Sequence, residues 1–158
     1  MKQFIFFSIL FGYTILIRGQ IKVQQTKEFI NDLKQITDIM VFDVTSPVAA
    51  ARYYAYATLS SYELMSTQDR KLYPSYVGIT KLTLKDHELA YKNLKNKDKS
   101  YRYAMVYTAR KLLPSGKKLL PLMNDLETFL EDDEIEYIQQ FSDAIIQYAN
   151  EDGFSQLN

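Results

Sequence analysis

Residues 46–65 read SPVAAARYYAYATLSSYELM, and they predict a helix on which the rest of the chain can pack. Ser46 can accept from free backbone N–H groups at a helix start, and Pro47 suits the first helical position because its φ is fixed. The small residues allow another helix to approach closely, and the tyrosines project in several directions. We therefore expect a central helix from Pro47 to about Met65, contacted on most of its sides.

The residues before this helix predict a second, amphipathic helix over 22–40. Its apolar residues recur at intervals of three and four, with polar residues such as Asp32 and Lys34 between them. The apolar set is Phe29, Ile30, Leu33, Ile36, Ile39 and Met40. Residues 41–45 then form a short extended connector.

The residues after the central helix predict further helices. Residues 66–76 read as a polar loop, and residues 77–99 show partial helical periodicity. A clearer helix covers 100–113 and ends there because the residue before Pro114 is pushed out of the helical region. Residues 117–131 carry the clearest period of the chain, with Pro121 in the first turns.

A last helix follows and completes an all-α fold. Asp132 or Asp133 can cap its start, its apolar positions run to Asn150, and it ends at Asp152-Gly153. No window alternates as a strand would, so we expect no significant sheet. The prediction is a helical bundle of about five to six helices.

Composition limits what this bundle can do. The chain has 158 residues, which fits one domain, and its nineteen basic and nineteen acidic residues give no net charge to hold nucleic acid. It has no cysteine, and its one histidine is His87. Since transition-metal sites usually need several imidazoles or thiolates, we expect no such site and no cofactor.

The first residues resemble a targeting segment. Met1 to Gln3 are short and basic, Phe4 to Ile17 are mostly apolar, and Arg18 ends the run. The run is shorter than the ~20 residues that a membrane-spanning helix needs. We expect a signal peptide over 1–19, a single helical domain over 20–158 without a stable membrane span, and export to the periplasm or beyond. The alternative is an uncleaved N-terminal anchor.

One stretch is similar to a known family. Residues 43–57, DVTSPVAAARYYAYA, resemble the N-terminal helical region of exported bacterial proteins in the superfamily of vanadium-dependent haloperoxidases and type 2 phosphatidic acid phosphatases. Residues 148–154, YANEDGF, are similar to the helix end that precedes the middle region of those proteins. The resemblance implies an all-helical scaffold over roughly residues 25–155.

The same resemblance implies that this chain lacks the catalytic half. The family's anion cage and two histidines occupy a Lys before an Arg-Pro, a Pro-Ser-Gly-His, and a Ser-Arg followed by His. This chain has a single histidine and no Arg-Pro pair. Its Pro114-Ser115-Gly116-Lys117 has lysine where the family has histidine, and we interpret it as a turn between helices with Ser115 as the cap. We therefore expect no catalytic residue here.

The remaining candidates favour structural roles. His87 lies among charged residues and is interpreted as a solvated side chain. The acidic run 131–136 lacks the ligand spacing of a calcium loop and suits a helix start. The basic run 92–99 is interpreted as a solvated loop rather than an anionic-surface site.

Arg52 is the residue that we single out most strongly. A guanidinium on an alanine-rich helix must be paired or exposed, and Asp43 is the nearest acidic residue before the helix. We predict a structural ion pair between Asp43 and Arg52 rather than a substrate-binding role.

Two functional hypotheses remain open. The first is a non-catalytic N-terminal helical portion of an exported haloperoxidase/phosphatase-like protein. The second is a free-standing exported helical module that binds a partner protein or an apolar ligand, since tyrosines mixed with small residues suit a pocket or an interface as well as a core. A homo-oligomer is compatible with either hypothesis.

Overall fold

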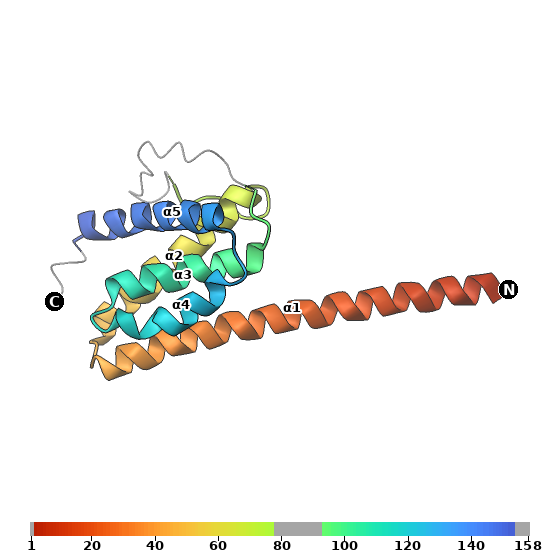
Figure 1. The fold of residues 1–158 in the computed structure, drawn as a ribbon, viewed down its shortest axis with the longest axis horizontal. Helices are drawn as coiled ribbons and strands as arrows, with labels where there is room; N and C mark the ends of the chain where they lie inside the picture. The colour runs from red at the N-terminus through yellow and green to blue at the C-terminus, as the bar shows by residue number, and fades with distance from the viewer. Residues whose placement is uncertain (1, 78–92, 154–158) are drawn as a thin grey trace.

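The computed structural model is an all-α protein (Figure 1). It describes the backbone of residues 2–77 and 93–153, and the side chains of residues 20, 22–77 and 93–153. Its elements are α1 (Lys2–Phe42), α2 (Pro47–Gln68), α3 (Lys97–Leu112), the short 3-10 helix η1 (Gly116–Leu119), α4 (Leu120–Glu127) and α5 (Asp132–Glu151). Within these ranges there are five α-helices and no strand, which confirms the predicted class.

The helix at the centre of the bundle is α3. It packs against α1, α2, α4 and α5, and ten of its sixteen residues are buried. The prediction that α2 would be central was therefore wrong. Small residues lie on every face of α2, and Ala51 and Ala55 remain exposed. Small residues allow another helix to approach closely, but they do not show that a helix packs at that position.

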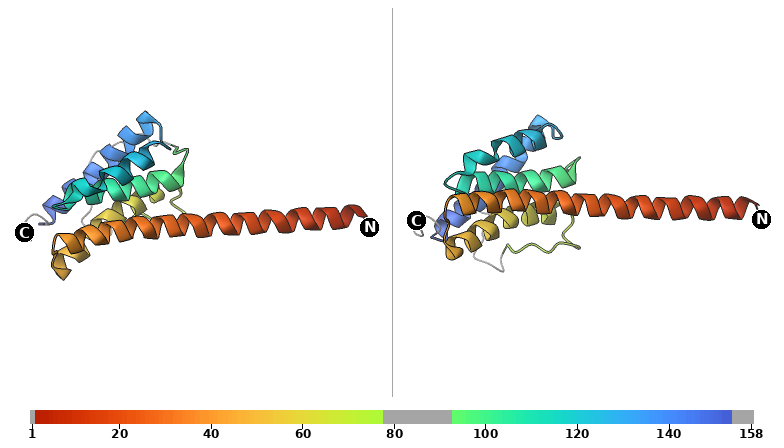
Figure 2. Two further views of the ribbon diagram at one scale, coloured as in Figure 1. Left: turned by 60° about the horizontal axis from the view of Figure 1, so that its bottom comes forward. Right: turned by 90° about the horizontal axis from the view of Figure 1, so that it is seen from below.

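The first helix is longer than its predicted range, because it runs unbroken from Lys2 to Phe42. Its N-terminal part extends well beyond the bundle, and only its C-terminal part lies along the other helices (Figures 1 and 2). Ile36, Ile39 and Met40 are buried as expected, whereas Ile30 is exposed. Among the residues whose side chains are described, no helix is long and apolar enough to cross a membrane.

The predicted helix starts and stops are largely confirmed. Ser46 caps α2, with its Oγ accepting from the Ala49 N–H at 3.3 Å, and Pro47 is the first residue of the helix. Leu113 is extended before Pro114, as steric exclusion requires. Gly153 follows α5 with a φ of 78°, a conformation that glycine adopts without strain.

The boundaries of the last two helices also differ from the prediction. The expected helix over 117–131 begins as η1 and ends as α4 at Glu127, because Thr128 to Leu130 close tighter turns with carbonyls three residues back. The cap of α5 is Glu131, not Asp132 or Asp133. Its side chain and that of Glu134 form a reciprocal capping box.

The region predicted as helical over 77–99 is described only at its edges. Residues 78–92, which include His87, lie outside the described residues. Residues 93–96 are not helical, and Leu94 among them is buried in the core. Asn96 then caps α3, whose first residue is Lys97.

Candidate functional site

Two segments far apart in the sequence, residues 43–57 and 148–153, meet in the structure. Arg52 Nη2 donates to the Asp152 carboxylate at 3.0 Å and to the Asp152 carbonyl at 3.1 Å. The Tyr56 hydroxyl donates to the same carboxylate oxygen at 2.6 Å, and the Tyr56 and Tyr148 rings meet edge to face. We call Arg52, Tyr56 and Asp152 the clasp. It fixes the end of α5 to the first half of α2.

The predicted partner of Arg52 must be corrected. Asp43 accepts a hydrogen bond from the Ser115 N–H at 3.0 Å, while Arg52 pairs with Asp152, one hundred residues along the chain. The turn after α1 directs Asp43 toward the start of η1, and the second turn of α2 directs Arg52 toward α5. Both residues tie segments together, as expected, but each has a partner that lies far away in sequence.

The clasp holds its tyrosine in the protonated form. Burial raises the pKa of Tyr56 to about 12, and the hydrogen bond to Asp152 acts in the same direction. A hydroxyl with such a pKa stays protonated near neutral pH and acts as a hydrogen-bond donor. General acid–base catalysis at that pH needs a group with a pKa close to 7. The clasp therefore supports structure, not proton transfer.

The Pro114-Ser115-Gly116-Lys117 fragment is a tight turn, as predicted. A Cβ on Gly116 would lie 2.0 Å from the Arg110 carbonyl oxygen, so only glycine fits there. Ser115 precedes η1, but its side chain makes no capping hydrogen bond, which corrects the cap role expected for it. The glycine of this fragment is therefore required by the close approach of the Arg110 backbone.

A buried ionic cluster between α1 and α3 was missed in the sequence. Arg102 is 5 % exposed and binds the fully buried Asp32 with two parallel bonds, Nε to Oδ2 at 2.6 Å and Nη2 to Oδ1 at 3.1 Å. Arg102 also contacts Glu28, which in turn accepts from Lys99 Nζ at 2.8 Å. The sequence pattern predicts Asp32 among the polar residues between the apolar positions of its helix. The available signal was the position of Asp32, three residues after Phe29 and four before Ile36, inside the apolar stripe.

The charges in this cluster neutralise one another. Hydrogen bonds from Lys99 and Gln24, and the positive charges of Lys99 and Arg102, lower the pKa of Glu28 to about 2. Arg102 is also within 3.8 Å of Asp98. These ion pairs hold α1 to α3.

The acidic run also has a structural role. Glu134 is buried and accepts from the Lys95 N–H at 2.6 Å, and Glu131 pairs with Lys95 Nζ at 2.5 Å. These carboxylates cap α5 and hold the residues that lead into α3. Among the described residues, no three histidine or acidic side chains gather as a metal site would require.

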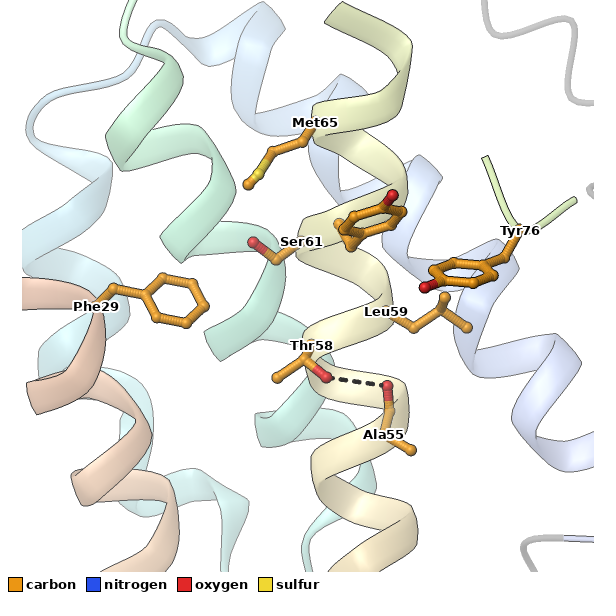
Figure 3. A pocket seen from close by; sticks show the side chains of 8 residues that line it. Phe29, Ala55, Thr58, Leu59, Ser61, Met65 and Tyr76 are labelled. Atoms are coloured by element: carbon orange, nitrogen blue, oxygen red, sulfur yellow. Dashed lines mark hydrogen bonds between the residues drawn. The ribbon is translucent and has the colours of Figure 1, made fainter. Parts of the chain in front are cut away.

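The seam between α1 and α2 contains a pocket of about 410 Å³. Phe29 from α1 and Tyr76 from the segment after α2 form its sides, and α2 supplies its floor (Figure 3). The α2 residues are Ala55, Thr58, Leu59, Ser61, Tyr62 and Met65. Ser61 is 2 % exposed, and its Oγ has no hydrogen-bond partner among the described residues. Tyrosines mixed with small residues suit a pocket, an interface or a core, so the sequence did not indicate a pocket at this position.

No protein-family model, curated protein or solved structure matches the chain.

Proposed function

We propose that the chain is the non-catalytic, N-terminal helical portion of an exported haloperoxidase/phosphatase-like protein. The observation that supports this proposal is the clasp. The two segments similar to that superfamily lie about one hundred residues apart, and their polar side chains bind each other through Arg52, Tyr56 and Asp152. Side chains used in this way build a scaffold.

Surface chemistry around the α1–α2 corner is consistent with this role. Val41, Phe42, Val44 and Val48 are all more than half exposed and lie close together in the chain. An apolar corner of this kind is what a scaffold presents to the part of a fold that covers it.

The proposal has a direct test in the reading frame that follows Asn158. We expect it to encode the two-histidine half, directly or after a frameshift or stop. The purified chain should hydrolyse p-nitrophenyl phosphate and oxidise bromide, with vanadate and peroxide supplied, only at background rates. Enzymic turnover by this chain alone would overturn the proposal.

The pocket favours a second candidate, a free-standing exported helical module that binds an apolar ligand. Its lining is mostly apolar and its volume is in the range of small-molecule sites. Absence of a downstream catalytic half, together with a monomer that unfolds in one sharp transition, would favour this candidate over the scaffold.

A further inference from the structure

We infer that the α1–α2 pocket binds a neutral, mainly apolar small molecule with one carbonyl group, and that Ser61 Oγ donates a hydrogen bond to that carbonyl. The inference deepens the second candidate function and rests on it in one respect, because a ligand must enter the pocket. It also applies if the chain is a scaffold, since the same surface exists in both cases.

The walls set the apolar character of the ligand. Phe29, Leu59 and Met65 present hydrocarbon and thioether surface, and the Tyr76 ring lies at the rim (Figure 3). None of the described residues that line the pocket carries a charge. The nearby Glu63 carboxylate already accepts from the Ser75 hydroxyl and the Tyr76 N–H, both at 2.7 Å. An ionic ligand would find no counter-charge and would lose its hydration without compensation.

Among the described residues that line the pocket, Ser61 is the one whose buried hydroxyl has no hydrogen-bond partner. The Thr58 hydroxyl donates to the Tyr54 carbonyl at 2.7 Å, and the Tyr62 hydroxyl donates to the Pro74 carbonyl at 2.9 Å. Ser61 Oγ has no such partner among the described residues, although its residue is almost fully buried. Buried polar groups are nearly always hydrogen-bonded, so an orphan hydroxyl beside a cavity indicates a missing acceptor or donor.

A carbonyl satisfies this hydroxyl better than other neutral groups do. A ketone, aldehyde or ester oxygen only accepts, so a single donor completes its requirement. A ligand hydroxyl could donate to Ser61 Oγ, but the Ser61 proton would then still lack an acceptor. If the ligand hydroxyl accepted that proton instead, its own proton would need a second acceptor in the apolar pocket. The one-to-one match of a free donor with a pure acceptor selects the carbonyl.

Access to Ser61 depends on Met65. The two residues lie four positions apart on α2, so they are neighbours on one helix face, and Figure 3 shows the Met65 thioether beside the Ser61 hydroxyl. A methionine side chain has three rotatable bonds and repacks readily. Its movement brings the Ser61 hydroxyl into contact with a ligand without a change in the helix.

The test uses the full chain labelled with ¹⁵N and three probes of equal length, 2-nonanone, nonane and nonanoate, with affinities measured by NMR titration. We expect 2-nonanone to bind most tightly, with shifts at Ser61 and Met65, and nonanoate to bind most weakly. Ser61→Ala should weaken 2-nonanone about three- to tenfold, the usual effect of one hydrogen bond, and leave nonane unchanged. Circular dichroism checks that the variant is folded.

A pair of variants separates the site from its chemistry. Ala55→Trp places an indole in the pocket mouth and should abolish binding of every probe, whereas Ala51→Trp, on an exposed position one turn earlier, should not. If Ala55→Trp has no effect, or if no probe binds, the pocket is not a ligand site and the second candidate function fails with it. If the probes bind but Ser61→Ala affects ketone and alkane equally, or nonanoate binds best, the pocket stands and the carbonyl assignment is overturned.

Discussion

Among the described residues, Val44 is the one non-glycine residue with a positive φ. It follows α1 with a φ of 52°, in the left-handed region that β-branched side chains avoid, and its side chain is almost fully exposed. Its N–H donates to the Val41 carbonyl at 3.1 Å, so the turn is held by hydrogen bonds although the side chain opposes it. The strain is part of how the chain reverses between α1 and α2.

Replacing this residue should therefore stabilise the protein. The left-handed region costs an L residue about 1–2 kcal/mol, and the extra freedom of glycine in the unfolded chain offsets about 0.5–1 kcal/mol of that. We expect Val44→Gly to raise the free energy of unfolding in urea by about 1 kcal/mol or less. Val41→Gly, a matched change at an exposed position inside α1, should lower it. A Val44→Gly protein no more stable than the parent would show that the turn is unstrained.

Residue-scale partners were the least predictable part of the site. The sequence indicated that Arg52 needs a partner. It did not indicate Asp152, because most of the helices of the bundle lie between the two residues in the sequence. The pairing of Asp32 with Arg102 could not be predicted, because the two residues lie 70 positions apart in the sequence. A charged residue within an apolar stripe indicates a buried ion pair only when the helix that packs against the stripe is known. A single sequence does not show which helix that is.

Helix boundaries, by contrast, could be predicted because their causes are local. Ser46-Pro47 and Leu113-Pro114 act through backbone sterics and capping bonds within a few residues. The order of packing could not be predicted in the same way. Apolar periodicity gives each helix one buried face, but the central place of α3 depends on how four other helices share its surface.

The turn between α3 and η1 allows a sharp test at the scale of an element. Since a Cβ on Gly116 would overlap the Arg110 backbone, Gly116→Ala must displace one of the two segments. We expect a loss of about 1–3 kcal/mol in unfolding free energy, the range of overpacked sites. Ser115→Ala, next to it, removes a side chain without a capping bond and should have little effect. Equal effects of the two changes would mean that the turn has room for a side chain.

At the scale of the whole molecule, stability should depend on acid through the cluster between α1 and α3. The pKa of Glu28 is lowered from 4.5 to about 2, so its ionised form favours the folded state. That contribution is complete above the unfolded pKa and is lost as the pH falls from about 4.5 to about 2. We expect thermal stability to decrease over this interval.

A substitution identifies the source of this dependence. Glu28→Gln should flatten the decrease between pH 4.5 and pH 2, measured as unfolding temperature, and should reduce stability near neutral pH. Glu136→Gln changes an exposed glutamate that, like Glu28, accepts from a glutamine four residues away, and it should leave the curve as in the parent. A curve unaffected by Glu28→Gln would assign the acid sensitivity to other carboxylates.

The pairing of Arg102 with Asp32 and Glu28 has a further consequence for how α1 is aligned. The two carboxylates lie one helical turn apart, and the guanidinium contacts both. A slip of α1 by one turn, about 5.4 Å, would move one of the two carboxylates away from Arg102 and would break the paired contact. The cluster therefore fixes the position of α1 along its own axis relative to α3. Apolar contacts alone would allow several such positions.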